Sequence, residues 1–311
     1  MSGVRRVRRS LLISPGDRRD LLTKLARSPA DVCVVELEDG IAISQKELAR
    51  QTTAELLGGL DWGPRERIVR INRVLTPHGE RDIEVVAGGK PDGIFLPKVE
   101  HVDEVRLAEE LVAGAESQHG LPAGAIQLWA MIEAAKGLLC VDEVCTASER
   151  MTGVVFGGGD FGADIRVKRL STGSFRRLPG PSVEYLYARG RIVAAARAAG
   201  IDPIDSGLAS VYDVDGTKLS AEYSAQMWFS GCIIFSPRQV APVHEAFQPP
   251  AEDIEWANEI LAAEASAAAQ DSTISFVAGD MVDGPFNINA RDILARVEAF
   301  AARDQAVQAE A

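Results

Sequence analysis

Acidic side chains stand at the ends of three separate apolar segments of this sequence. Glu36, Glu38 and Asp39 close VCVVELED, Glu133 closes IQLWAMIE, and Asp160 follows VVFGGG. If these segments are neighbouring parallel strands, their carboxylates meet at one rim. Carboxylates gathered in a concave site repel one another unless a hard cation neutralises them. The pattern therefore predicts a site for Mg²⁺, or for Mn²⁺ in its place.

Glu133 and Asp160 are the metal-ligand candidates. A single carboxylate at a strand end is more often a helix N-cap or half of a loop ion pair, but Glu133 ends a segment too apolar to face solvent. Asp160 lies in a glycine loop whose N–H groups can face a ligand, so Gly158, Gly159 and Asp160 are predicted to bind substrate. Two carboxylates leave coordination positions free for a chelating substrate such as a 2-oxo acid.

Other charged side chains belong to the same rim. Glu38 and Asp39 are predicted to hold metal-bound waters. Arg70, in IVRIN, forms either a structural salt bridge to the acids or a contact with a substrate carboxylate or developing oxyanion, and its position leaves both roles open. Lys98, in FLPKVE, is a poor candidate for a Schiff base because nearby acids raise the pKa of an amine.

The elements that must position these residues alternate along the chain. Short apolar segments, often β-branched, are separated by segments of helical periodicity such as 18–26, 102–114 and 185–199. Eight strand and helix pairs predict an α/β fold, a TIM (β/α)8 barrel, with the acids at its C-terminal rim. The predicted strands are 11–14, 32–37, 67–71, 93–97, 126–132, 152–156, 203–211 and 231–235.

A C-terminal extension follows the barrel. QPPAED supplies a proline stop and an acidic helix start. We predict a catalytic barrel over 1–248 and an extension over 249–311 that packs on or reaches a neighbouring subunit. Within the extension we expect a helix over 252–269, a hairpin over 274–285 that turns at Ala278-Gly279-Asp280, and a closing helix over 289–303.

Composition narrows the class of partner. The 311 residues carry a net charge of −12, which speaks against nucleic acid or an anionic membrane and favours a small molecule. No stretch approaches the roughly 20 apolar residues of a membrane span, and the arginines of MSGVRRVRRS precede no apolar segment of signal-peptide length. The cysteines lack metal-ligand spacing and are predicted to be reduced, buried thiols of a cytoplasmic protein, namely Cys33, Cys140, Cys145 and Cys232.

Several familiar motifs are absent or fail on inspection. The four histidines are too dispersed for a zinc hydrolase, and neither G-x-S-x-G nor a P-loop occurs. Residues 157–162 satisfy G-x-G-x-x-G, but Asp160 would face the pyrophosphate and no strand follows to carry the ribose-binding acid. Asp213-Val214-Asp215-Gly216 lacks the third ligand of a calcium loop, so we expect a turn before a helix.

The motifs together resemble one family over nearly the whole chain. RRSLLISPGDR, VVELEDG, VRINR, TPHGERD, GIFLPKVE, LWAMIEAAKG, VVFGGGDFGADI and YARGRIVAAARAAGIDPID occur in this order. They resemble the citrate lyase β-subunit-like branch of the HpcH/HpaI aldolase family. The resemblance implies a (β/α) barrel with a C-terminal extension, a homotrimer or hexamer, and Mg²⁺-dependent cleavage or formation of C–C bonds in 3-hydroxyacyl thioesters such as citryl-, malyl- and citramalyl-CoA.

The resemblance also implies roles for single residues. It makes Glu133 and Asp160 the metal ligands and Arg70 the contact to a substrate oxyanion or carboxylate. It places Glu38 and Asp39 beside the metal waters. Asp283, in DMVDGPFNINA, matches an acid/base aspartate that related lyases present from a neighbouring subunit, whereas its sequence context alone indicates a hairpin turn.

This chain departs from the family pattern at a few positions. Members that use CoA commonly carry GK and then IHP near the eighth strand, where this chain has Cys232 and Ser236. Gly159 and Ala134 replace an acid and a threonine or serine beside the two ligands. We therefore expect a Mg²⁺-dependent lyase of a 3-hydroxyacyl-CoA that releases a 2-oxo acid. The alternatives are a CoA-independent class II 2-oxo acid aldolase and a non-catalytic barrel with a binding or assembly role.

Overall fold

The computed structural model describes residues 6–167 and 183–310. Residues 1–5, at the start of the MSGVRRVRRS segment, lie outside this description. The chain divides into two compact units, one formed by Arg8–Phe247 and the other containing Gln248–Ala311.

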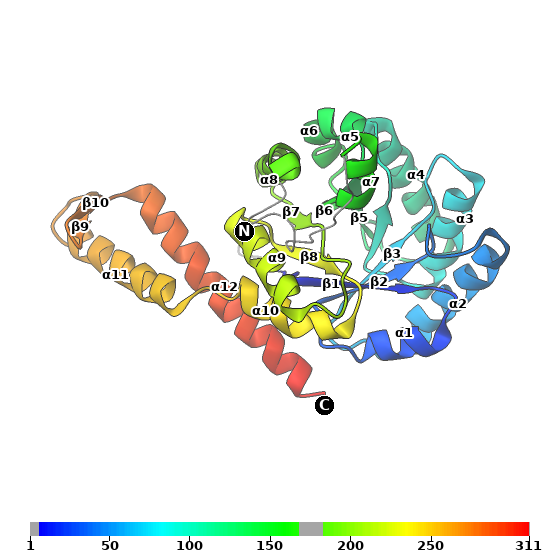
Figure 1. The fold of residues 1–311 in the computed structure, drawn as a ribbon, viewed down its shortest axis with the longest axis horizontal. Helices are drawn as coiled ribbons and strands as arrows, with labels where there is room; N and C mark the ends of the chain where they lie inside the picture. The colour runs from blue at the N-terminus through cyan, green and yellow to red at the C-terminus, as the bar shows by residue number, and fades with distance from the viewer. Residues whose placement is uncertain (1–5, 168–182, 311) are drawn as a thin grey trace. The chain divides into compact units, whose positions relative to one another are not determined.

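The first unit is a closed barrel of eight strands, each parallel to its neighbours and arranged in sequence order (Figure 1). The predicted TIM barrel is therefore confirmed. The strands are β1 (Ser10–Pro15), β2 (Val32–Glu36), β3 (Glu66–Arg70), β4 (Gly93–Leu96), β5 (Gln127–Ile132), β6 (Met151–Phe156), β7 (Asp202–Asp205) and β8 (Gly231–Ile234).

Helices surround these strands in Figure 1 and supply the crossovers that parallel neighbours need. They are α1 (Arg19–Ala26), α2 (Lys46–Gly59), α3 (Pro77–Val86), α4 (Val102–Gln118), α5 (Ala135–Leu139), α6 (Val141–Cys145), α7 (Gly158–Asp164), α8 (Leu186–Ala199), α9 (Val214–Gln226) and α10 (Val240–Phe247). Asp213 accepts a hydrogen bond from the Gly216 amide at the start of α9, which confirms the predicted turn before a helix.

An apolar cluster fills the inside of the barrel. Side chains alternate between the two faces of a strand, so every second residue points inward. The buried cluster contains such residues from all eight strands, namely Leu11, Val32, Val34, Ile68, Phe95, Trp129, Met131, Val155, Ile204 and Ile233. The residues that follow these at the same alternation reach the C-terminal rim.

Charged side chains close the opposite, N-terminal end of the barrel. The buried Arg8 guanidinium lies 4.2 Å from the centre of the Trp129 ring. Arg8 Nη2 lies 2.6 Å from Glu66 Oε1, and Nη1 lies 3.0 Å from Asp202 Oδ2. Glu66 and Asp202 begin their strands, so this contact set ties the ends of β3 and β7 together.

The seventh strand is shorter than predicted. We expected a strand over 203–211, whereas β7 ends at Asp205. The reason lies at Gly207, where an added Cβ would overlap the carbonyl oxygen of Ile233. The chain crosses close over the backbone of β8 at this glycine, and this leaves no room for a side chain and no regular strand.

The second unit consists of α11 (Ala251–Ala268), a hairpin of β9 (Ser275–Val277) and β10 (Asp280–Val282), and α12 (Gly284–Gln308). Its core contains Ala257, Ile260, Val282, Ala290 and Ile293. Ala278 and Gly279, which connect the two strands, both have positive φ, 51° and 94°, as a two-residue type I′ turn requires.

The last helix begins earlier than predicted and ends later, at Gly284 and Gln308 rather than at 289 and 303. The predicted hairpin, 274–285, includes Pro285. Proline lacks an N–H donor, and the first turn of a helix does not need that donor, so α12 accommodates Pro285 there.

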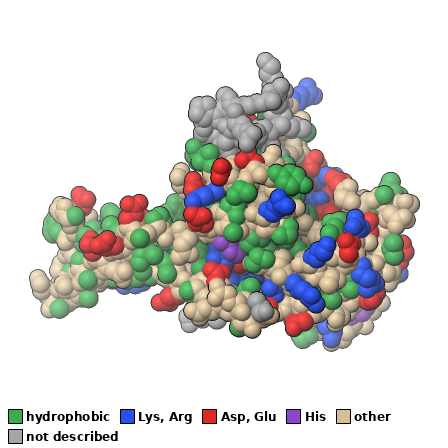
Figure 2. Space-filling view, turned by 60° about the horizontal axis from the view of Figure 1, so that its bottom comes forward, with side chains coloured by type: hydrophobic (Ala, Val, Ile, Leu, Met, Phe, Trp, Pro, Cys, Tyr) green, Lys and Arg blue, Asp and Glu red, His purple; other side chains and the backbone are tan. Residues whose placement is uncertain are grey.

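The cysteines are free thiols, and Cys33, Cys145 and Cys232 are buried. Cys140 is only partly buried, so the prediction of buried thiols is wrong for this residue, whose helix-capping position leaves its side chain at the surface of the barrel. No helix among the described residues is long and apolar enough to span a membrane. On the face displayed in Figure 2, Lys and Arg side chains are interspersed with Asp and Glu side chains.

Candidate active site

Three charged residues continue the inward-facing alternation of their strands to the C-terminal rim. Glu36 follows Val34 on β2, Arg70 follows Ile68 on β3, and Glu133 follows Met131 after β5. Residues Glu36 and Arg70 are direct register partners in the β2–β3 pair. The barrel therefore brings side chains that are far apart in sequence to one place above its apolar interior.

Arg70 lies among carboxylates, as its position led us to expect. Its Nε donates to Glu36 Oε2, its Nη2 lies 3.2 Å from Glu38 Oε2, and its Nη1 lies 3.8 Å from the sulfur of Met131. Burial alone would lower the pKa of Arg70, but the charges of Glu36 and Glu38 outweigh it and raise the pKa. The guanidinium is thus charged, and acids hold its Nε and Nη2. Its Nη1 contacts a sulfur, which is a weak acceptor, so a substrate oxygen could take the place of this contact.

Glu36 is a site residue that the sequence interpretation missed. The sequence places Glu36 among the rim acids of VCVVELED but gives it no separate role. In the structure Glu36 Oε1 also accepts the backbone N–H of Glu38, so one buried carboxylate fixes both Arg70 and the start of the acidic loop. Burial raises the pKa of Glu36. The signal that could have found it is the period of two that runs from Val32 through Val34.

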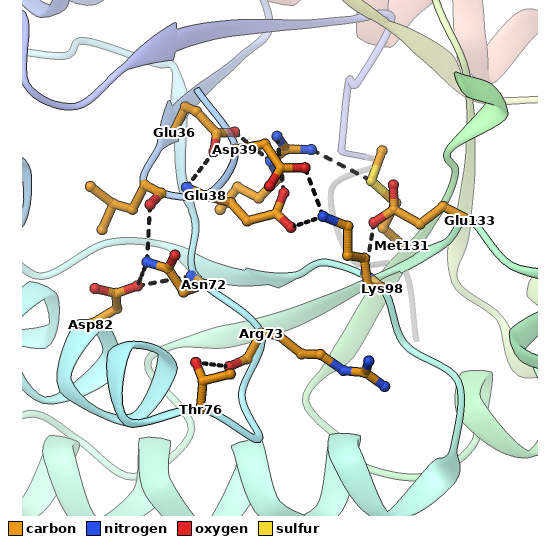
Figure 3. Close-up of polar contacts among 12 residues, drawn as sticks. Glu36, Glu38, Asp39, Asn72, Arg73, Thr76, Asp82, Lys98, Met131 and Glu133 are labelled. Atoms are coloured by element: carbon orange, nitrogen blue, oxygen red, sulfur yellow. Dashed lines mark hydrogen bonds and ion pairs between the residues drawn. The ribbon is translucent and has the colours of Figure 1, made fainter. Parts of the chain in front are cut away.

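Lys98 links the acidic pair to the metal-ligand candidate. Its Nζ lies 2.6 Å from Glu38 Oε1 and 2.7 Å from Asp39 Oδ2, and its backbone N–H donates to Glu133 Oε1 at 2.7 Å (Figure 3). Burial opposes its charge, but Asp39 and Glu38 raise the pKa of Lys98 above its usual value. A protonated amine is not a nucleophile, which agrees with the poor Schiff-base chemistry that we predicted.

The loop that carries Glu38 and Asp39 is fixed by buried polar contacts. Lys46 Nζ donates to the carbonyl oxygens of Leu37 and Glu38 at 2.7 Å and 2.6 Å. Asn72 Nδ2 donates to the same Leu37 oxygen at 3.0 Å and to Asp82 Oδ2 at 2.6 Å (Figure 3). The acidic pair is therefore held from its backbone, and its side chains are left to Arg70 and Lys98.

Glu133 and Asp160, the predicted ligands, follow the neighbouring strands β5 and β6 at the C-terminal rim. Glu133 is 4% exposed, while Asp160, the third residue of α7, is exposed. Burial, a hydrogen bond between the two carboxyl groups, and the charge of Glu38 raise the pKa of Glu133 to about 8. Without a cation, Glu133 therefore holds its proton at neutral pH. A divalent cation would take the place of that proton, so the donor set fits Mg²⁺.

No group of three or more His, Cys, Asp or Glu side chains within 6–167 and 183–310 is arranged to hold a metal. The candidate site has two carboxylates, and Mg²⁺ is commonly bound by one or two, with water or substrate in the other positions. Their assignment as ligands remains a prediction.

The glycine loop before Asp160 leaves room for Glu133. A Cβ at Gly157 would lie 2.5 Å from Glu133 Cβ and 2.9 Å from its Oε2, so a side chain at this position would displace the carboxylate. The backbone N–H of Gly158, which we predict to face substrate, donates instead to Ser206 Oγ at 2.6 Å. The substrate contacts of Gly158 and Gly159 stay predictions, and the first would require that hydrogen bond to open.

Three further residues have roles that the sequence left open. Asp283 is partly buried and immediately precedes α12 in the second unit; its acid/base role stays a prediction. Cys232 is buried in β8. Ser236 accepts the Arg238 N–H at 3.4 Å and caps the short helix η4 (Pro237–Gln239). Of the two residues that depart from the family pattern, Cys232 is therefore part of the barrel core and Ser236 is a helix cap.

Comparison with known proteins agrees with this architecture. The family described as HpcH/HpaI aldolase/citrate lyase matches residues 9–237. The citrate lyase subunit beta of Leuconostoc mesenteroides is 32% identical over 289 residues, which cover 93% of each chain. The L-malyl-CoA/beta-methylmalyl-CoA lyase of Cereibacter sphaeroides is 33% identical, covering 89% of this chain and 91% of that protein.

The chain also resembles a solved structure that contains ligands. CitE from Mycobacterium tuberculosis, in complex with magnesium, acetoacetate and coenzyme A, superimposes with a TM-score of 0.76 at 30% identity. The match covers 94% of this chain and 98% of that one.

Proposed function

This chain belongs to the HpcH/HpaI aldolase/citrate lyase family, and we propose from this premise that it is a Mg²⁺-dependent carbon–carbon lyase. Its substrate would be a 3-hydroxyacyl-CoA of the citryl-, malyl- or citramalyl-CoA kind. The products would be a 2-oxo acid and an acyl-CoA fragment. The similar citrate lyase β subunit and malyl-CoA lyase, and the CitE structure with magnesium and coenzyme A, support this proposal.

One observation carries the proposal. Glu133 and Asp160 follow the neighbouring strands β5 and β6 at the C-terminal rim, and burial together with Asp160 and Glu38 raises the pKa of Glu133 to about 8. A buried acid beside a second carboxyl group is unfavourable for the fold alone, whereas it is suited to binding a divalent cation. The charged guanidinium of Arg70 lies on the same rim.

The residues of the chain would divide the chemistry among them. Bound Mg²⁺ would act as a Lewis acid toward the oxygen of the carbinol and of the 2-oxo acid that forms from it. Arg70 Nη1, whose hydrogen-bond partner among the described residues is the weakly accepting Met131 sulfur at 3.8 Å, would donate to the substrate carboxylate or the developing oxyanion. Glu38 and Asp39 would orient metal-bound water.

Proton transfer would fall to Asp283. When the C–C bond breaks, the hydroxyl proton leaves the carbinol oxygen, and the acyl fragment takes up a proton at carbon. We propose that Asp283 moves this proton from a neighbouring subunit of a homotrimer or hexamer. Equal mixtures of inactive Asp283→Asn and Glu133→Gln subunits should regain activity, since some mixed sites contain neither change. If the mixture stays as inactive as its components, Asp283 does not act across an interface.

The experiment that tests the function compares thioesters with free acids. Citryl-, malyl- and citramalyl-CoA, and then citrate, malate and citramalate, are incubated with Mg²⁺ or with EDTA, and release of the 2-oxo acid is followed. The proposal expects Mg²⁺-dependent release from at least one thioester and none from the free acids. Turnover of a free aldol without CoA would instead establish the class II aldolase, which the missing lysine and histidine at Cys232 and Ser236 favour.

Absence of turnover together with absence of Mg²⁺ binding would identify a non-catalytic barrel.

The cellular site that fits the proposal is the cytoplasm, because the four cysteines are free thiols and reducing compartments keep thiols in that state.

A further inference from the structure

Asp160 reaches the site from a backbone that has few side chains to fix it. It follows Gly157, Gly158 and Gly159, and it is the third residue of α7, a helix of only seven residues. Glycine has the greatest conformational freedom of all residues and offers no side chain for packing. The position of the Asp160 carboxylate therefore depends on contacts that other elements make with this loop.

One hydroxyl group supplies such contacts on both sides of the bend. Ser206 Oγ donates to the carbonyl oxygen of Phe156, the last residue of β6, at 2.7 Å. Ser206 Oγ also accepts the backbone N–H of Gly158, the first residue of α7, at 2.6 Å. A serine hydroxyl has one hydrogen to give and lone pairs to accept with. Ser206 thus bridges the strand end and the helix start across Gly157.

The bridge is closely fitted. A Cβ built on Gly158 would lie 2.8 Å from Ser206 Oγ and 3.2 Å from the Phe156 ring. The loop also donates the Gly157 N–H to the Ile132 carbonyl on β5 at 2.9 Å. The loop therefore touches β5 through its backbone and the end of β7 through Ser206.

Ser206 is itself anchored in the barrel wall. Its backbone N–H donates to Asp205 Oδ1 at 2.8 Å. The Asp205 side chain is fully buried, and it accepts Arg189 Nε at 3.1 Å and Ser224 Oγ at 2.6 Å. A fixed carboxylate below Ser206 holds the backbone from which the bridging hydroxyl projects.

We propose that Ser206 is a positioning residue that sets the glycine loop, and through it the Asp160 carboxylate, in the geometry that binds Mg²⁺. The inference rests on the proposed function, because it needs Asp160 to be a metal ligand. Ser206 does not touch the metal or the substrate in this role. It acts by restricting the loop before the metal arrives, so its removal should weaken metal binding more than it weakens the fold.

Ser224→Ala is a matched control. Ser224 also donates its hydroxyl to a buried acceptor of this network, Asp205 Oδ2, and it is fully buried. It has no hydrogen bond to the glycine loop, since its other hydrogen bond is to the Ser220 carbonyl. Ser206→Ala and Ser224→Ala each remove one hydroxyl from the same network, but only the first removes the bridge.

The test is calorimetric titration of the full-length, EDTA-treated and dialysed protein with MgCl₂. Ser206→Ala should bind Mg²⁺ about 10-fold more weakly than the wild type, the scale on which supporting residues affect metal affinity. Ser224→Ala should stay within about 2-fold, although thermal unfolding without Mg²⁺ should show comparable destabilisation of both variants. Ser206→Cys keeps a weak donor and acceptor and should fall between the wild type and Ser206→Ala.

Glu133→Gln separates failure of this inference from failure of the proposed function. If Glu133→Gln loses Mg²⁺ binding while Ser206→Ala binds as the wild type does, Ser206 has no positioning role and the function stands. Equal weakening in Ser206→Ala and Ser224→Ala would also overturn the inference, because it would show a general effect of stability. If Glu133→Gln binds Mg²⁺ like the wild type, the proposed metal site itself is wrong.

Discussion

Replacing Glu133 with glutamine should make the metal-free protein more stable, and the effect should grow with pH. In the unfolded chain this carboxyl ionises near its usual pKa of 4.5, whereas in the folded, metal-free protein its pKa is raised to about 8. When folding raises the pKa of a carboxyl, the free energy of unfolding falls as pH rises from the unfolded-state pKa to the folded-state pKa. Glutamine has the same shape and does not ionise, so it escapes this loss.

The magnitude follows from the two pKa values. At pH 6 the unfolded carboxyl is ionised and the folded one is not, which costs about 2 kcal/mol by linkage. At pH 9 both are ionised, and the full difference amounts to about 5 kcal/mol. These figures apply because Glu133 is 4% exposed, so solvent does little to screen it. Glutamine Oε1 can still accept the Lys98 N–H that Glu133 accepts at 2.7 Å.

Urea unfolding in EDTA at pH 6 and pH 9 measures this directly. Glu133→Gln should be more stable than the wild type at both values, with the larger gain at pH 9. Added Mg²⁺ should stabilise the wild type and leave the variant unchanged. If Glu133→Gln is equally stable or less stable at pH 9 in EDTA, the acid pair is not strained and our argument for a cation site is refuted.

The same substitution at another buried glutamate provides the control. Glu104 is 3% exposed, and its carboxylate lies 3.3 Å from Arg73 Nε. Because this acid has a cation for a partner, Glu104→Gln should destabilise the protein. Glu104→Gln should be less stable than the wild type with or without Mg²⁺. This result would distinguish Glu104, which is paired with an arginine, from Glu133, which we propose binds a metal.

Three further outcomes are expected. Arg70→Lys should lower kcat/KM about 100-fold or more with Mg²⁺ affinity nearly unchanged; parallel loss of metal binding would give Arg70 a structural role only. Treatment with a 2-oxo acid and borohydride should leave no adduct on Lys98, because its neighbours raise its pKa; an adduct found by mass spectrometry would contradict this. Burial raises the pKa of Cys145 to about 12, so at pH 8 roughly one Cys145 thiol in ten thousand is ionised. A thiol reagent should therefore label Cys145 far more slowly than the partly exposed Cys140. Equal labelling rates would show that Cys145 is accessible.

The sequence predicts the barrel and the rim because both depend on local patterns. Apolar strand segments alternate with helical segments eight times, which implies a closed parallel barrel, and in such a barrel the strand ends share one rim. The pairing of Glu133 with Asp160 follows from this geometry without any knowledge of their contacts. Glu36 could have been found in the same way, since its alternation with Val34 predicts an inward side chain.

Other parts of the site depend on contacts that no local pattern encodes. Ser206 is separated from Phe156 by 50 residues and from Gly158 by 48, and Lys46 acts on the backbone of a loop eight to nine residues away. The early end of β7 results from the close approach of Gly207 to β8, which becomes visible only when the two strands are placed side by side. These contacts between distant segments can be seen only in the three-dimensional structure, because hydrophobic periodicity predicts elements and not the contacts between them.

A crystal structure of the protein with Mn²⁺ and pyruvate, with anomalous data collected to locate the metal, tests the central claim most directly. Our account predicts one anomalous peak at the C-terminal rim, coordinated by the carboxylates of Glu133 and Asp160, with pyruvate completing the coordination and its carboxylate facing Arg70. A rim without metal, with Mn²⁺ bound elsewhere, would contradict it.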